Sequence, residues 1–376
     1  MAFFERSIFH GKSEEDFTEV NSKTDWTLDY YDLISNTSQL KTNACCTLSK
    51  PASHIRDAIS NIHENVTSQY YGCGLVVPEA LLNCKCLDLG CGCGRDCYIL
   101  SQLVGENGQV VGIDMTDSQL KVAKDTVDYH TKKFNYKIPN IRFVKGYIER
   151  MDYAFGLDSA SSFDIIVSNC VVNLSPDKRA VLQQAYKFLK EGGEMYFSDV
   201  YADRRVPVDL EADKIMWGEC LSGALYYNDF LRLAKECGFT DPRLVSDKVI
   251  TINNKELEKR IGGRVRFYSA TYRLFKLKTL EPDCEDYGQA IEYKGTIDHL
   301  PNSFELDAHH CFPTGKILPV CGNTYRMLHE TRFKEHFKFY GTFDVHYGLF
   351  EGCGKTIPFA SSKSSSSSSS SDGGCC

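Results

Sequence analysis

The feature that most constrains the fold is a regular alternation of strand-like and helix-like segments. Apolar and β-branched runs that read as strands lie at residues 84–89, 109–114, 141–146, 163–169 and 193–200. Between them apolar residues recur at helical spacing, and we expect the last of these helices to end at Gly192 and Gly193. This alternation predicts a mostly parallel sheet with helices on both faces, whose ligands bind at the carboxyl ends of the strands.

Composition limits the classes of partner. The 376 residues carry a net charge of −7, which argues against nucleic acid because no basic stripe is available to neutralise phosphates. No run approaches the ~20 apolar residues of a membrane span, and the first residues lack the long apolar stretch of a secretory signal. We therefore expect a cytoplasmic protein with no membrane or nucleic-acid partner, working as a monomer.

A glycine-rich segment, CLDLGCGCGRD at residues 86–96, follows the first strand. Such a turn lets a ligand approach the backbone and opens onto unpaired N–H groups of the next helix. The obvious rival reading is a dinucleotide site, which needs G-x-G-x-x-G/A. Counting from Gly90 or from Gly92, the sixth position is Arg95 or Cys97, so that pattern fails. Asp114, at the end of the second strand, can accept ribose hydroxyls, but ribose belongs to either cofactor.

Four motifs in order carry a resemblance. DLGCGCGRD, GIDM, GYIE and SNCVVNL each follow a strand, and together they resemble the motifs of class I S-adenosylmethionine-dependent methyltransferases. The resemblance implies a Rossmann-like α/β fold and assigns a set of cofactor-binding residues. Asp88, Gly90, Gly92 and Gly94 would flank the methionine part, Asp114 and Met115 the ribose and adenine, Ile148 and Glu149 the adenine edge, and Asn169 the centre of the site. Tyr70 and Tyr71 can be read as core residues at a helix end, but one of them, for which we take Tyr70, can lie against the sulfonium through a cation–π contact.

The chain contains 17 cysteines. Most can be read as small buried residues, but the positions of four suggest another role. Cys170 directly follows the fourth strand, Cys73 lies on the segment leading into the first strand, Cys220 follows the fifth strand and its helix, and Cys45 lies on the N-terminal segment. Their spacing is too long for a local zinc knuckle, so the fold would have to assemble any shared site.

The segments that carry these cysteines narrow the resemblance to one family of methyltransferases. TNAC, SQYYGCGLVVPE, SNCVVNLSPDK and WGECLSGALY resemble segments of the arsenite S-adenosylmethionine methyltransferases, with similarity from about residue 24 to 280 and more weakly to about 340. The resemblance implies that Cys73, Cys170 and Cys220 hold arsenic and that Cys45, or its neighbour Cys46, exchanges a disulfide with Cys73. It also implies arsenite or its thiol conjugates as substrate, mono- and dimethylated products, arsenic detoxification, and thioredoxin or glutathione as reductant.

The chemistry of trivalent arsenic agrees with this assignment. Arsenic(III) is soft and prefers thiolates. Three sulfur ligands leave it pyramidal with an exposed lone pair that can attack the sulfonium methyl in line, so no general base is needed. Methylation raises arsenic to the pentavalent state, and a dithiol that closes to a disulfide can return the electrons.

The sequence pattern divides the chain into five parts. We expect a partly disordered segment with a short helix (1–40), a cofactor-binding domain with the arsenic-binding thiols (41–240), the end of the core sheet with the rest of the arsenic-binding region (241–280), a small β-rich domain (281–350) and a disordered serine-rich tail ending in Cys-Cys (351–376). Two alternatives stay open: a small-molecule C- or O-methyltransferase, and a thiol-rich protein that binds soft metals without turnover.

Overall fold

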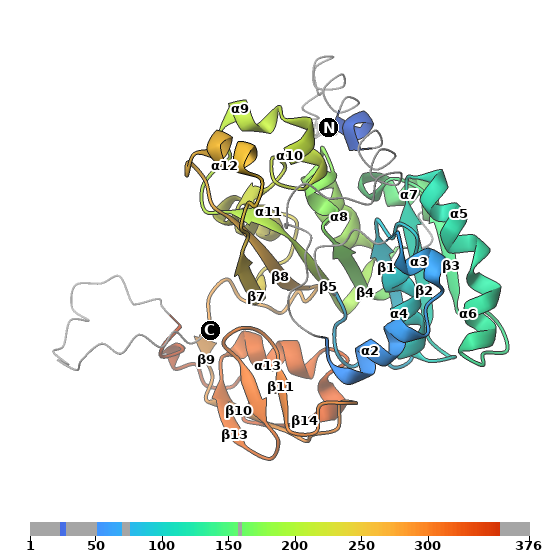
Figure 1. Ribbon diagram of the computed structural model, residues 1–376. Helices are drawn as coiled ribbons and strands as arrows, with labels where there is room; N and C mark the ends of the chain where they lie inside the picture. The colour runs from blue at the N-terminus through green and yellow to red at the C-terminus, as the bar shows by residue number, and fades with distance from the viewer. Residues whose placement is uncertain (1–22, 28–50, 70–75, 157–159, 354–376) are drawn as a thin grey trace, which may run out of the picture.

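A central sheet forms the body of the molecule (Figure 1). The computed structural model describes residues 23–27, 51–69, 76–156 and 160–353. The eight-stranded sheet has the order β3-β2-β1-β4-β5-β8-β7, and β6 pairs with the end of β5. Its strands are β1 (Lys85–Leu89), β2 (Gln109–Asp114), β3 (Ile141–Lys145), β4 (Phe163–Asn169), β5 (Leu189–Ala202), β6 (Leu225–Tyr226), β7 (Arg243–Val249) and β8 (Phe267–Phe275).

The first five strands of this order run parallel, whereas β8 is antiparallel to both β5 and β7. Helices cover both faces, which confirms the predicted fold class. They are α2 (Ser53–Ser60), α3 (Glu64–Thr67), α4 (Arg95–Val104), α5 (Asp117–Asp125), α6 (Val127–Lys133), α7 (Met151–Phe155), α8 (Lys178–Phe188), α9 (Val208–Glu211), α10 (Lys214–Gly218), α11 (Tyr227–Glu236) and α12 (Lys255–Ile261), with the 3₁₀ turns η1 (Ile148–Arg150) and η3 (Val172–Leu174).

The two faces of the sheet have separate cores because successive strand residues point to opposite sides. On β1, Leu87 packs with the α8 and α11 side chains, and Cys86 packs with those of α2 and α4. Both side chains are fully buried. A strand covered on both faces reads as a continuous apolar run rather than an alternating one, which is why the sequence signal for β1 was strong.

One predicted boundary was wrong. The helix before β5 ends at Phe188, not at Gly192 and Gly193, and β5 begins at Leu189. Pairing with β8 explains the difference, since the Gly192 N–H donates to the Lys276 carbonyl oxygen at 2.9 Å and the Lys276 N–H donates to the Gly193 carbonyl oxygen at 2.8 Å. These contacts between distant segments override the local helical pattern.

The C-terminal part forms smaller sheets, confirming the prediction of a β-rich appendage. Its strands are β9 (Glu285–Asp286), β10 (Gln289–Tyr293), β11 (Ser303–Glu305), β12 (Cys311–Pro313), β13 (Ile317–Val320), β14 (Phe337–Tyr340) and β15 (Gly348–Leu349), with helix α13 (Gly322–His329) and the turn η4 (Lys334–His336). The sequence did not predict α13. Phe275, the last residue of β8, and Leu277, two residues later, belong to the core of this part, so it packs directly on the central sheet.

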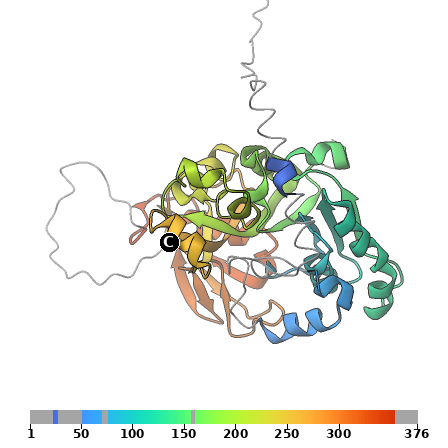
Figure 2. The same ribbon diagram turned by 45° about the horizontal axis from the view of Figure 1, so that its top comes forward.

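Residues 23–27 are helical and lie against α10, where the Trp217 indole N–H donates to the Thr27 hydroxyl at 3.1 Å. This segment, drawn blue, sits at the top of the sheet in both ribbon views (Figures 1 and 2). None of the helices in the described part of the chain is long and apolar enough to cross a bilayer.

Candidate methyl-transfer site

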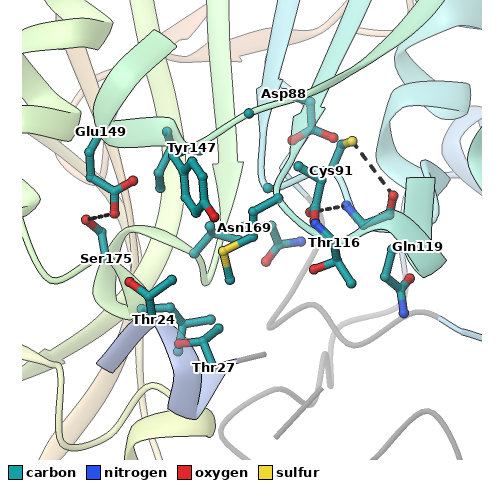
Figure 3. A pocket seen from close by; sticks show the side chains of 18 of the residues that line it. Thr24, Thr27, Asp88, Cys91, Thr116, Gln119, Tyr147, Glu149, Asn169 and Ser175 are labelled. Atoms are coloured by element: carbon teal, nitrogen blue, oxygen red, sulfur yellow. Dashed lines mark hydrogen bonds between the residues drawn. The ribbon is translucent and has the colours of Figure 1, made fainter. Parts of the chain in front are cut away.

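A cleft opens at the carboxyl ends of β1, β2 and β4 and encloses about 1070 Å³, including the part open to solvent. Eight of the residues assigned by resemblance line it. They are Asp88, Gly90, Gly92, Asp114, Met115, Ile148, Glu149 and Asn169. Figure 3 shows that the labelled side chains converge on one space from several strand ends. Gly94 is not in the lining, and Tyr70, Cys45 and Cys73 lie outside the described residues.

The glycines of the loop after β1 have different tasks. Gly90 has a φ of +67°, and a Cβ built there would lie 2.4 Å from a Val171 methyl carbon. Gly94 has a φ of +88°, and its Cβ would lie 2.7 Å from the Phe143 ring. Gly94 also precedes the first residue of α4. Gly90 therefore keeps the cleft wall close to the loop after β4, whereas Gly94 allows the turn to pack on β3.

Asp114 is fixed by two backbone donors. Its Oδ2 accepts from the Gly92 N–H and its Oδ1 from the Thr116 N–H, both at 2.8 Å. Burial raises the pKa of Asp114, and these donors act in the opposite direction. Since each carboxylate oxygen has a further lone pair, the group can hold the loop in place and still accept ligand hydroxyls.

Acidic side chains gather at one end of the cleft. Asp88 is 3% exposed and accepts a hydrogen bond from the Cys97 thiol, with 3.1 Å between sulfur and oxygen. Burial, followed by the nearby Asp96, raises the pKa of Asp88 well above its usual range. Asp96 accepts from the Asn169 amide at 3.0 Å. A ligand with positive charge on an ammonium and a sulfonium fits this end of the cleft.

The opposite end is less polar. Met115, Ile148 and Leu174 line it, and the Ser175 hydroxyl donates to Glu149 at 2.5 Å. Apolar side chains beside a fixed carboxylate suit a flat ring that carries an amino group. The residues therefore fit S-adenosylmethionine from its methionine end to its adenine.

Sequence reasoning missed several lining residues. Thr24 and Thr27 come from the helical segment 23–27, and Ser175 and Pro176 come from the loop after η3. Nothing local in the sequence marks these positions, because they reach the cleft only through packing of distant segments.

Two of the predicted thiols come together beside this cleft. The Cys220 thiol donates to the Cys170 carbonyl oxygen at 3.1 Å, and Cys170 follows directly on Asn169 of the cleft wall. Cys170 and Cys220 have φ values of 56° and 63°, a left-handed conformation that costs a residue with a side chain about 1 kcal/mol or more. Such strain concentrates at functional sites. Cys170 is disulfide-bonded in the structure.

Asp199 is a third member of this group that the sequence analysis missed. One of its carboxylate oxygens and the sulfurs of Cys170 and Cys220 all lie within 4.8 Å of one another. Asp199 accepts from the Asn173 N–H at 3.0 Å and from the Val200 N–H at 2.8 Å. Burial raises its pKa to about 7. Its position near the end of β5 was the available signal, since strand ends supply ligand-binding residues in this fold.

A doubly covered sheet of this order, with a glycine loop after β1 and a fixed carboxylate after β2, defines an S-adenosylmethionine-dependent methyltransferase. Comparison with known proteins agrees. A methyltransferase domain model matches residues 82–238, and a model of the arsenite methyltransferase C-terminal domain matches residues 287–376.

The chain is 54% identical over 330 residues to an arsenite methyltransferase of Aquipseudomonas alcaligenes, which covers 88% of this chain and 94% of that protein. It is 48% identical over 311 residues to an arsenite methyltransferase of Homo sapiens, covering 82% and 81%. The crystal structure of an arsenic(III) S-adenosylmethionine methyltransferase from Chlamydomonas reinhardtii superposes with a TM-score of 0.77 at 47% identity, covering 80% of this chain and 100% of that one. The chain belongs to the arsenite methyltransferase family, which confirms the resemblance and the prediction of an enzyme.

Proposed function

We propose that this enzyme transfers the methyl group of S-adenosylmethionine to trivalent arsenic held by Cys73, Cys170 and Cys220, giving mono- and dimethylated arsenicals. The observation that carries the proposal is the grouping of the Cys170 and Cys220 sulfurs beside the cofactor cleft. Cys170 adjoins Asn169, which lines the cleft, so arsenic on the Cys170 sulfur would lie next to the methyl donor.

The residues of the cleft favour transfer mainly by position. When bound, S-adenosylmethionine supplies an electrophilic methyl on a sulfonium. The carboxylates of Asp88 and Asp96 stabilise positive charge at their end of the cleft. Gly90 keeps the cofactor loop close to the loop after β4 that carries Cys170. Holding two reactants in line can supply several kcal/mol of the barrier reduction.

Binding of arsenic to the thiols does not change its oxidation state. Each thiol of the enzyme replaces one hydroxyl of arsenite, so an As–S bond forms, an As–O bond breaks and the thiol proton leaves in a water molecule. The bound arsenic then carries no proton, and its lone pair is the nucleophile. No general base is required for the transfer step.

Turnover needs a thiol reductant. Since Cys170 is disulfide-bonded in the structure, it must be reduced before it can bind arsenic. Exchange with the thiols of thioredoxin or glutathione would do this, and after methylation a dithiol such as Cys45 with Cys73 would return two electrons to pentavalent arsenic. We propose that a monomeric enzyme works in the cytoplasm, where these reductants are available, and serves arsenic detoxification.

The experiment is transfer of labelled methyl to arsenite in the presence of a thiol reductant. We expect product from the wild type and from Cys237→Ser, and none from Cys170→Ser. Cys237 is the control because its thiol, directly after α11, donates to the Arg179 carbonyl oxygen and is not a member of the group of Cys170, Asp199 and Cys220. No product from a folded wild type that binds the cofactor would refute the proposal.

The same assay separates the two other candidate functions. A C- or O-methyltransferase would keep its activity on an organic acceptor in Cys170→Ser. A binding protein would take up arsenite without consuming S-adenosylmethionine. Neither is favoured, because the chain combines a cleft lined by eight of the assigned cofactor residues with the sulfurs of Cys170 and Cys220 beside it.

A further inference from the structure

A second pair of cysteines lies in the C-terminal part, at a distance from the methyl-transfer site in the sequence. Cys284 and Cys353 both line one cavity of about 430 Å³. The pairing of β9 with β15 brings them there, because the Phe350 N–H donates to the Cys284 carbonyl oxygen at 2.8 Å and the chain then turns back, with the Cys353 N–H donating to the Phe350 carbonyl oxygen at 3.3 Å. Both residues are partly exposed, so a small solute can reach them.

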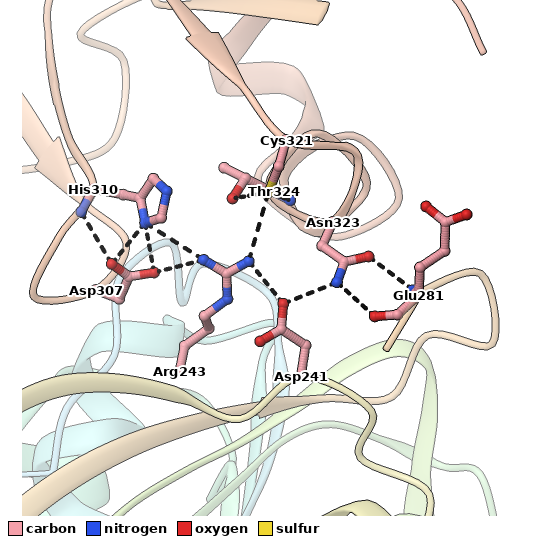
Figure 4. Close-up of polar contacts among 8 residues, drawn as sticks. All are labelled: Asp241, Arg243, Glu281, Asp307, His310, Cys321, Asn323 and Thr324. Atoms are coloured by element: carbon pink, nitrogen blue, oxygen red, sulfur yellow. Dashed lines mark hydrogen bonds and ion pairs between the residues drawn. The ribbon is translucent and has the colours of Figure 1, made fainter. Parts of the chain in front are cut away.

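A fixed polar network forms another wall of this cavity. The Asp241 carboxylate accepts from the Arg243 guanidinium at 2.7 Å and from the Asn323 amide at 3.0 Å. Asn323 also donates to the Glu281 carbonyl oxygen at 2.8 Å, and Figure 4 shows how these side chains join β7 to the start of α13. The network fixes the position of Asp241 and leaves the two sulfurs as the thiophilic groups of the cavity.

The number of donor atoms decides which ligand such a cavity suits. A structural zinc ion needs about four close ligands. Within the described residues, the one group with three donor atoms within 4.8 Å of one another is that of Cys170, Asp199 and Cys220. Trivalent arsenic that already carries one organic substituent needs only two sulfurs to complete its three bonds.

We propose that the Cys284–Cys353 cavity is a second thiol site that binds monosubstituted trivalent arsenicals. The identity of its physiological ligand, the singly methylated product, rests on the proposed function, whereas the binding of monosubstituted arsenicals to the two sulfurs does not. Each thiol displaces one hydroxyl from the arsenic, so two As–S bonds form, two As–O bonds break and two water molecules leave without any change in oxidation state.

The first test is protection from alkylation. The reduced full-length protein, without S-adenosylmethionine, is treated with excess phenylarsine oxide and then with N-ethylmaleimide, and each cysteine is mapped by peptide mass spectrometry. We expect alkylation of Cys284 and Cys353 to slow together by at least about tenfold, or ~1.4 kcal/mol, and Cys311, which is exposed on β12, to react as before. Unchanged alkylation of the pair overturns the site.

A variant tests whether both sulfurs are needed. In Cys284→Ser the protection of Cys353 should disappear, whereas Cys311→Ser should leave it intact. Protection of Cys353 that persists in Cys284→Ser overturns the paired site, as does equal protection of the wild type by Zn²⁺. The first methylation of arsenite should proceed at the wild-type rate in Cys284→Ser, so failure of this site and failure of the proposed function give different results.

Discussion

The thiol of Cys220 donates a hydrogen bond to the backbone carbonyl oxygen of Cys170, with 3.1 Å between sulfur and oxygen. The two residues belong to different segments, after β4 and after α10, and both have a left-handed backbone. The contact therefore ties together the two loops that carry the proposed arsenic ligands. It also predicts how a conservative change at Cys220 will behave.

Cys220→Ser should keep the fold and lose the chemistry. A hydroxyl can make the same hydrogen bond to the Cys170 carbonyl oxygen, but it is a poor ligand for arsenic. We expect arsenite methylation to fall by at least about 100-fold, equivalent to ~3 kcal/mol, with cofactor affinity within about twofold of wild type. Calorimetric titration with S-adenosylmethionine and a methyl-transfer assay check both parts. Retained methylation would remove Cys220 from the arsenic site.

Gly90→Ala should weaken cofactor binding. The new methyl would lie 2.4 Å from a Val171 methyl carbon, at a φ of +67° that disfavours a side chain. Relief requires the loop after β4 to move away from the cleft. We expect S-adenosylmethionine affinity to fall by more than about tenfold, or ~1.4 kcal/mol. Gly263→Ala is the matched control, because Gly263 has a φ of +69° with nothing within 4 Å of its Cβ position. Equal affinities in the two variants would contradict the steric explanation.

The elements that the sequence predicted well are those whose signal is local. The strand from Lys85 to Leu89 is a mostly apolar run buried on both faces. The turn at Gly90 is recognisable from the spacing of the glycines in the sequence. The end of α8 was misplaced because the pairing of Gly192 with Lys276 joins segments far apart in the sequence. No local pattern reports such a contact.

Some residues of the candidate site likewise have a local sequence signal, and others do not. Motif residues such as Asp114, the last residue of β2, line the cleft, as expected for residues at strand ends. Thr27 and Ser175 reach the cleft from loops and a distant helical segment, and Asp199 joins the cysteines only through the geometry of β4 and β5. The functional roles of all these residues stay predictions.

Asp114→Asn should impair the cofactor site by reversing one hydrogen bond. The carboxylate accepts from two backbone N–H groups, of Gly92 and Thr116, and an amide nitrogen would face one of them as a second donor. We expect a loss of about 1–3 kcal/mol in S-adenosylmethionine binding, measured by calorimetry. Asp117→Asn is the control, because Asp117 is exposed and pairs with Lys145 at the surface; its affinity should not change. Normal binding by Asp114→Asn would exclude a role in holding the loop or the ribose.

His130 should make the stability of the protein fall in mild acid. The ring is 1% exposed, and its Nε2 accepts from the His63 N–H at 3.1 Å while its Nδ1 lies 2.8 Å from the Thr126 carbonyl oxygen. Nδ1 is therefore the protonated nitrogen, and a second proton on Nε2 would break the bond from His63. Burial lowers the pKa of His130 to about 4.

The unfolded chain, with a histidine pKa of about 6.5, binds this proton more readily than the folded protein does. The contribution of His130 is thus fully present above pH ~6.5 and is lost as the pH falls toward ~4, by up to about 2–3 kcal/mol. Urea unfolding between these pH values should show a shallower decline for His130→Gln than for wild type. The same substitution at His346, an exposed histidine on the C-terminal part, should leave the slope unchanged; parallel curves for wild type and His130→Gln would rule out this linkage.

Arg243→Met should loosen the C-terminal part from the central sheet. The Arg243 guanidinium is buried and pairs with Asp241 at 2.7 Å and with Asp307 at 3.2 Å. Removing the cation takes this countercharge from the buried Asp307 carboxylate and from the partly buried Asp241 carboxylate, at a cost of about 3–5 kcal/mol. Arg205→Met, which breaks an exposed pair with Asp229, should cost less than about 1 kcal/mol. Unfolding in urea measures both, and hydrogen exchange should show faster exchange in β11 and α13 of Arg243→Met. A variant as stable as Arg205→Met would mean that apolar packing of Phe275 and Leu277, rather than this ion pair, joins the two parts.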